Sequence, residues 1–193
     1  NVELLNYVIS DAVGEVEFNL AEASDSSGII AHPLTKTVQK RVLPMRSLDS
    51  LLGERRVDVL KIDTEGNELK VLQGCQAVLR ANPALRLIIE FNPKCLRAAG
   101  VEPEQLLDAL LGLGYEIYFC HDRRRQLYRL DANDLSSWRS IITDLEYINL
   151  WCVPAAESLF VCYVSHSSKR QGAERSMLTL ATELTEQGVY SHI

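Results

Sequence analysis

A junction between a strand and a helix, carrying three carboxylates, constrains this chain more than any other feature. The apolar stretch 57–62 ends at Asp63, and Glu65 and Glu68 follow within five residues, with Gly66 between them. Apolar residues then recur at spacings of three and four, which is typical of an amphipathic helix. The pattern predicts a strand that stops, turns sharply at Gly66 and enters a helix. Ligands of open α/β sheets bind outside the carboxyl ends of the strands, so these acids are candidates for a site.

Helix capping is the alternative explanation of the same carboxylates. Asp, Thr and Glu are residue types that cap helix N-termini and complement the helix dipole. Capping accounts easily for one or two of the three acids, and less well for all three. Glu65 and Glu68 are therefore candidates either for chemistry or for holding the start of the helix.

The order of the expected elements predicts an α/β fold. Expected strands alternate with expected helices, which indicates βαβ units and a parallel sheet, with antiparallel strands near the end. The nearly continuous apolar run 85–91 is typical of a strand buried on both faces, and we expect it to lie parallel to strand 57–62. Strands are expected at 2–10, 15–20, 37–43, 57–62, 85–91, 115–120, 126–130 and 147–153, and helices at 47–52, 67–79 and 103–112.

Composition excludes some classes of partner. The net charge of −6 and the pI near 5.3 disfavour a nucleic-acid surface, which usually needs a basic face. No stretch approaches the roughly 20 apolar residues of a membrane span. The five cysteines are odd in number and include no CxxC pair, so zinc ligation and a disulfide framework are both poorly supported. We expect buried free thiols in a reducing cytoplasm.

A second alternation of expected strand and helix begins near the C-terminus. The stretch 154–157 is typical of a linker, and a strand at 159–164 and a helix from 173 are expected after it. One strand and one helix cannot form a core alone. We therefore expect one domain at 1–155 and the start of a second domain at 157–193.

Three blocks of sequence resemble the FkbM family of S-adenosylmethionine-dependent methyltransferases. They are the segment 1–11 with Gly14, the block 60–74 and the strand 87–91 that contains Glu90. The resemblance covers about residues 1–154. It implies a Rossmann-like class I methyltransferase fold and S-adenosyl-L-methionine as cofactor. It also implies that the family's glycine-rich turn lies upstream of Asn1, so that this chain is an N-terminally truncated domain, inactive alone.

The stretch after the expected linker has a resemblance of its own. Residues 159–167, 172–175 and 180–184 are similar to the opening βα unit of GT-B-type glycosyltransferases. This resemblance implies that a methyltransferase domain is fused to a glycosyltransferase.

The expected activity is O-methylation of a hydroxyl on a sugar, a glycan or a related natural product. A hydroxyl acceptor benefits from a general base, and Asp63, Glu65 and Glu90 are the catalytic candidates because two adjacent strand ends would bring them to one rim. Ser10, Asp11 and Asp63 are the candidates for binding the cofactor. A turn of the Asp-x-x-Gly type is the alternative reading of Asp11.

Two other interpretations of individual residues stay open. His121 follows an expected strand and is a possible base, although a lone histidine is more often structural. Asp63, Glu65 and Glu90 could together hold Mg²⁺, which prefers oxygen ligands, but no spacing specific to a metal site is visible. We expect no metal.

Two alternatives to an active methyltransferase also stay open. The chain could be a non-catalytic α/β module that positions a glycosyltransferase, or the glycosyltransferase could carry the only activity. A glycine-rich strand and turn upstream of Asn1 would favour the enzyme.

Overall fold

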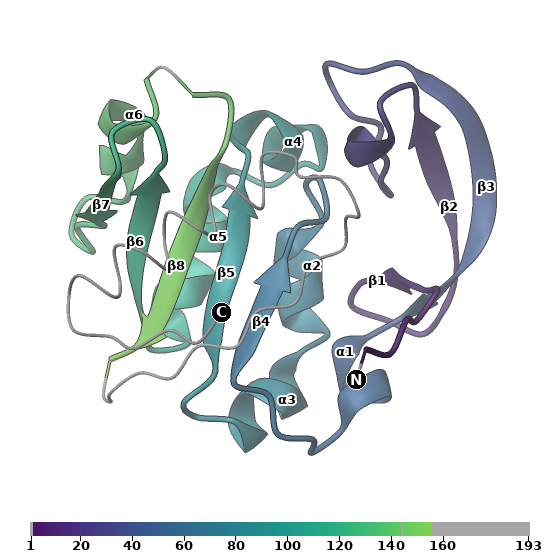
Figure 1. The fold of residues 1–193 in the computed structure, drawn as a ribbon, viewed down its shortest axis with the longest axis horizontal. Helices are drawn as coiled ribbons and strands as arrows, with labels where there is room; N and C mark the ends of the chain where they lie inside the picture. The colour runs from purple at the N-terminus through teal and green to yellow at the C-terminus, as the bar shows by residue number, and fades with distance from the viewer. Residues whose placement is uncertain (1, 144, 156–193) are drawn as a thin grey trace. The chain divides into compact units, whose positions relative to one another are not determined.

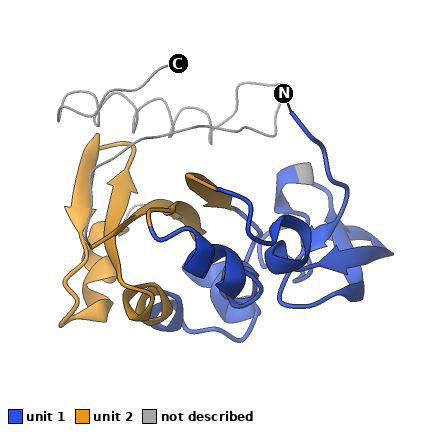
Figure 2. Ribbon diagram, turned by 90° about the horizontal axis from the view of Figure 1, so that it is seen from below, with its two compact units in different colours: residues 1–56, 63–83, 92–106 blue, residues 57–62, 84–91, 107–193 orange. Residues whose placement is uncertain are grey.

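The computed structural model describes residues 2–143 and 145–155, which fall into two compact units (Figure 2). Unit 1 comprises residues up to 56, 63–83 and 92–106, and unit 2 comprises 57–62, 84–91 and the described residues from 107 onward. The chain therefore passes repeatedly from one unit to the other. The expected second domain at 157–193 lies outside the described residues.

Unit 1 contains a three-stranded sheet with the order β1-β3-β2. Strands β2 (Gly14–Ala21) and β3 (Thr37–Arg46) are antiparallel, and the short strand β1 (Val8–Ile9) runs parallel to the end of β3. The strand expected at 2–10 is thus reduced to two residues. Val2 and Leu4 are each 79% exposed, so no element among the described residues buries these two apolar side chains, which suggested a longer strand.

The helix expected at 67–79 is two helices in the structure, α2 (Glu68–Gln73) and α3 (Gln76–Ala81). Gly74 ends α2, and the Asp49 carboxylate starts α3 by accepting hydrogen bonds from the backbone N–H groups of Ala77 and Val78. A side-chain cap from a distant residue therefore divides a stretch whose apolar periodicity is continuous.

Two further helices complete unit 1. Helix α1 (Leu48–Leu52) begins after Ser47, whose side chain accepts from the Ser50 N–H. Helix α4 (Pro93–Ala98) was not expected from the sequence. It begins after Asn92, whose side chain accepts from the N–H groups of Lys94 and Cys95, and Pro93 occupies its first turn. A short 3-10 helix, η1 (Ser24–Ser26), precedes β3.

Unit 2 contains a five-stranded sheet with the order β4-β5-β8-β6-β7. Strands β4 (Val59–Ile62) and β5 (Arg86–Phe91) pair in parallel, which confirms the predicted pairing and the α/β class. Strand β8 (Ile148–Pro154) lies between β5 and β6 (Tyr115–His121) and is antiparallel to both (Figure 1). Strand β7 (Gln126–Arg129) forms a hairpin with β6.

Aromatic side chains pack the interior of unit 2. The Phe91 ring lies edge-on to Phe119 and Trp138, with ring centroids 5.8 and 5.4 Å apart. Trp138 begins the short helix α6 (Trp138–Ile141), which follows the 3-10 helix η2 (Leu135–Ser137). Edge-to-face pairs of this kind add to the free energy of burial. All of β5 is buried, as its apolar sequence predicts.

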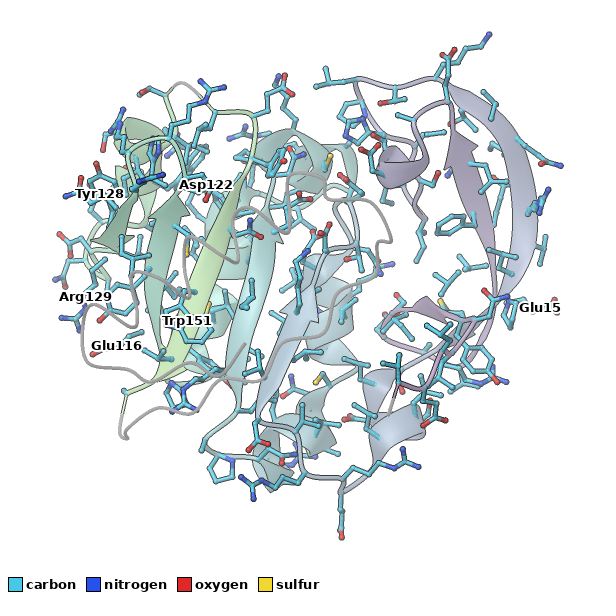
Figure 3. The ribbon with its side chains drawn as sticks, in the orientation of Figure 1. Glu15, Glu116, Asp122, Tyr128, Arg129 and Trp151 are labelled. Atoms are coloured by element: carbon cyan, nitrogen blue, oxygen red, sulfur yellow. The ribbon has the colours of Figure 1, made fainter. Side chains whose placement is uncertain are left out.

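Helix α5 (Pro103–Gly112) carries the chain from unit 1 into unit 2. On the exposed side of the β6–β7 hairpin, the Arg129 Nη2 donates to the Glu116 Oε1 at 2.6 Å, and Figure 3 shows these side chains on neighbouring strands. None of the helices in the described part of the chain combines the length and the hydropathy that a membrane crossing requires.

Candidate functional site

The loop that follows β4 makes the sharp turn that the sequence predicts. Glu65 has a φ of 52° and Gly66 a φ of 101°, so two successive residues adopt the left-handed region. A Cβ atom at Gly66 would lie 2.6 Å from the carbonyl oxygen of Cys95. Only glycine satisfies both requirements there. Glu65, by contrast, holds a conformation that is costly for a residue with a side chain.

The Glu68 carboxylate holds this loop in place. Its Oε1 accepts hydrogen bonds from the Thr64 N–H at 3.0 Å, the Thr64 hydroxyl at 3.1 Å and the Gly66 N–H at 3.1 Å. Glu68 is 1% exposed, and burial raises the pKa of its carboxyl above the ordinary value of 4.5, although these hydrogen bonds oppose the shift. Glu68 therefore serves the structure of the loop.

Glu65 is half-buried between two side chains of unit 1. Its Oε2 lies 3.4 Å from the Cys95 Sγ, which donates to it, and 3.6 Å from the His32 Nε2. Burial raises the pKa of Glu65 to about 7, and the nearby carboxylates of Asp63, Glu68 and Asp25 add to this shift. The Cys95 hydrogen bond opposes it. A carboxyl with a pKa near neutrality can both accept and donate a proton at physiological pH.

The end of β1 is tied to the same loop. The Asn67 side chain donates to the Ile9 carbonyl oxygen at 2.9 Å, and the Ser10 hydroxyl lies 3.5 Å from the Asn67 Oδ1. The same hydroxyl donates to the Asp11 Oδ1 at 3.0 Å. Ser10 is buried, whereas Asp11 is exposed. Of these two predicted cofactor-binding residues, Asp11 is the one whose side chain is open to solvent.

Four of the five predicted site residues belong to unit 1. They are Ser10, Asp11, Asp63 and Glu65, and among them Asp11 and Asp63 are exposed. Glu90 belongs to β5 of unit 2 and is 7% exposed. The grouping of Glu90 with Asp63 and Glu65 stays a prediction.

His121 ends β6 in unit 2 and is buried. Its Nδ1 accepts from the Arg124 N–H at 3.3 Å, and its ring lies edge-on to Tyr128 with centroids 6.1 Å apart. These contacts suit a histidine that shapes the turn after β6, which is the structural interpretation that the sequence left open.

A hollow of about 270 Å³ lies in unit 2, where β6 ends and β8 begins. Polar and apolar side chains line it together, and it is smaller than the roughly 300–1,000 Å³ of typical ligand pockets. The lining residues are Cys120, Asp122, Arg123, Leu145, Glu146, Tyr147, Ile148 and Asn149. Figure 3 labels Asp122 at this end of β6.

Sequence reasoning did not find His32 or Cys95 as neighbours of Glu65. His32, Glu65 and Cys95 follow one another at intervals of about 30 positions. Neither His32 nor Cys95 stands in a recognisable motif. The buried cysteines Cys75, Cys95, Cys120 and Cys152 are not joined in disulfides. Burial raises the pKa of the Cys75 thiol to about 12, so this thiol is unreactive.

Comparison with known protein families agrees with the resemblance noted in the sequence. The family described as the methyltransferase FkbM domain matches residues 3–117. No curated protein and no solved structure matches the chain significantly. The match spans more than half of the 193 residues and includes every predicted site residue. The chain therefore belongs to the FkbM methyltransferase domain family.

Proposed function

We propose that the chain is part of an S-adenosylmethionine-dependent O-methyltransferase that acts on a hydroxyl of a sugar, a glycan or a related natural product. The observation that carries the proposal is the loop after β4, where an exposed acid, Asp63, precedes a half-buried acid, Glu65, whose pKa is about 7. Both acids lie within the segment that matches the methyltransferase family.

The sheet of unit 2 supports a Rossmann-like class I methyltransferase fold. The consecutive strands β4 and β5 are parallel and are joined through α2 and α3, as in a βαβ unit. The last described strand, β8, returns antiparallel within the same sheet. Mixed sheets of this kind are common among α/β enzymes.

The side chains of unit 1 fit a cofactor that carries hydroxyl and ammonium groups. Asp11 and Asp63 expose carboxylates at the ends of β1 and β4, and carboxylates accept hydrogen bonds from such groups. Ser10 is buried and would act by orienting Asp11 through their 3.0 Å hydrogen bond. Bound S-adenosylmethionine would supply a methyl group that its sulfonium already activates.

The chain's own residues would then orient the acceptor and remove its proton. A general base with a pKa near 7 would accept the proton of the acceptor hydroxyl, and Glu65 meets this requirement best. Asp63 would orient cofactor or acceptor. Ile62 and Ile89 are register partners in β4 and β5, and each is followed by an acid, Asp63 and Glu90, which keeps Glu90 a candidate.

Binding and transfer assays on the full-length gene product test this function. We expect S-adenosylmethionine and S-adenosylhomocysteine to bind in calorimetry, and radiolabelled methyl groups to appear on free sugars or glycosides. The label should survive alkaline treatment, because methyl ethers resist base and methyl esters do not. Absence of cofactor binding would favour the non-catalytic module instead.

The fusion to a glycosyltransferase is a separate part of the proposal, supported by the resemblance of residues 159–184. The same full-length protein should hydrolyse a nucleotide sugar or transfer the sugar from it to an acceptor. Deletion of the coding sequence after residue 155 should abolish that activity. If nucleotide sugars are neither bound nor consumed, the proposed fusion is wrong. The proposal of methyl transfer does not depend on that result.

A further inference from the structure

We propose that His32, Glu65 and Cys95 form a zinc-binding site in unit 1. The Nε2, Oε2 and Sγ atoms of these residues come together from three distant segments of the chain. Imidazole nitrogen, carboxylate oxygen and thiolate sulfur are the three donors that Zn²⁺ takes in proteins. With Zn²⁺ bound, Glu65 is a metal ligand and cannot also be the general base proposed above, so these two roles of Glu65 are alternatives.

Two of the three separations between the donor atoms match a tetrahedral zinc site. With metal–ligand distances of about 2.0–2.3 Å, neighbouring ligands on a tetrahedron lie roughly 3.3–3.7 Å apart. The Glu65 Oε2 lies 3.6 Å from the His32 Nε2 and 3.4 Å from the Cys95 Sγ. All three atoms lie within 4.8 Å of one another. A small inward shift of His32 or Cys95 would complete the face of the tetrahedron.

The backbone already presents these side chains. Glu65 has a left-handed φ of 52°, and the neighbouring Gly66 approaches the Cys95 carbonyl so closely that no side chain fits between them. Gly28 lies against the loop, since a Cβ there would be in ordinary van der Waals contact with the Glu65 Cβ at 3.6 Å. Little reorganisation would therefore accompany metal binding, and preorganised ligands bind metals more tightly.

The contacts of the His32 Nδ1 allow a metal-binding tautomer. The Thr35 hydroxyl lies 3.1 Å from this atom and can accept its proton, which leaves the lone pair of Nε2 for the metal. In the other tautomer the Leu34 N–H donates to Nδ1 at 3.2 Å, a hydrogen bond that the first tautomer gives up, and the proton on Nε2 faces Glu65. The first tautomer corresponds to the zinc-bound ring and the second to the metal-free ring.

Accessibility suits three protein ligands and one open position. Cys95 is fully buried, and the side chains of His32 and Glu65 are 9% and 14% exposed. Solvent therefore reaches His32 and Glu65 to a small extent, and a water molecule can be the fourth ligand. Binding replaces the thiol proton of Cys95 with the metal and releases that proton to solvent.

Zinc titration of the 193-residue chain tests the proposal. We expect one Zn²⁺ per chain in competition with a colorimetric chelator, and a higher unfolding temperature because the metal binds the native state. Substitution with Co²⁺ should give a thiolate-to-metal absorption band. Cys95→Ser and His32→Gln should each weaken zinc binding at least about a hundredfold and remove the cobalt band.

The matched control is Cys75→Ser, which changes another buried cysteine of unit 1 outside the cluster. This variant should retain both the affinity and the cobalt band. The proposal is overturned if the unmodified chain gives no thiolate band with Co²⁺, which requires no variant to fold. It is equally overturned if Cys95→Ser binds zinc as well as the unmodified chain, or if Cys75→Ser loses binding to the same extent.

Discussion

The Asn67 side-chain amide donates a hydrogen bond to the Ile9 carbonyl oxygen at 2.9 Å, across 58 positions of sequence. Both the end of β1 and the loop after β4 carry predicted site residues. This bond therefore fixes Ser10 and Asp11 with respect to Asp63 and Glu65. It also satisfies the carbonyl of a strand whose ladder is only two residues long.

Replacement of Asn67 by alanine should destabilise the protein by about 1–3 kcal/mol, because the partly buried Ile9 carbonyl loses its hydrogen bond from the amide. Asn67 is 3% exposed, so water does not readily replace the amide. Urea unfolding measures the change. Asn133→Ala removes an exposed asparagine and should change the free energy of unfolding by less than about 0.5 kcal/mol. Equal effects of the two substitutions would contradict the role given to Asn67.

Gly74→Ala should cost about 1–3 kcal/mol, because the new methyl group overlaps the Ser10 carbonyl oxygen. The backbone of Gly74 has a φ of −85°, which alanine adopts freely, so the contact alone causes the effect. Gly112→Ala is the matched control, since it places a methyl group in open space at the end of α5. That variant should be neutral or slightly more stable in thermal unfolding. A harmless Gly74→Ala would show that β1 does not pack against the end of α2.

Glu68→Gln should stabilise the protein increasingly as pH rises. The folded-state pKa of Glu68 is raised by burial, so the native state binds more protons than the unfolded state above pH 4.5, and stability falls as pH rises through that window. Glutamine keeps an oxygen that accepts from Thr64 and Gly66 but carries no charge. Urea unfolding from pH 4 to 8, with a chelator present, gives the difference between variant and wild type.

Glu65 contributes a pH dependence of the same sign between 4.5 and about 7. The slope of stability against pH should therefore be reduced in Glu68→Gln and reduced further in the double variant with Glu65→Gln. A difference between Glu68→Gln and wild type that stays constant over this range would mean that Glu68 titrates normally in the folded protein.

Asp63→Asn in the full-length protein should lower methyl transfer by about a hundredfold or more while leaving folding intact. Asp63 is exposed, so its neutralisation should change the free energy of unfolding by less than about 0.5 kcal/mol. Asp108→Asn, on the exposed side of α5, is the control and should retain full turnover. Unchanged turnover in Asp63→Asn removes this residue from the mechanism.

Local patterns predicted most of the strands, because alternation and apolar runs report burial directly. The strand at 85–91, the turn at Gly66 and the parallel pair β4–β5 all followed from residues close together in sequence. The division of the expected helix at Gly74 could not be predicted from nearby residues. It depends on Asp49 and Ser10, which lie far away along the chain. Helix α4 was missed because Pro93 suggested an end rather than a first turn.

The candidate site was predictable only as far as its loop. Asp63 and Glu65 stand in a motif, and their position after a strand indicates a site. His32 and Cys95 carry no local signal, and only the tertiary structure brings them to Glu65. The same holds for Glu68, whose role in bonding Thr64 and Gly66 depends on the geometry of the turn.

The central position of β8 in the sheet affects how unit 2 folds during synthesis. Until Ile148–Pro154 has left the ribosome, the β4–β5 pair and the β6–β7 hairpin have no strand to join them. The sheet therefore closes in one late step, whose loop entropy is large because β5 and β8 are more than 50 residues apart. A nascent chain that pauses before residue 148 exposes two strand edges at once, and chaperones or proteases would encounter it in that form.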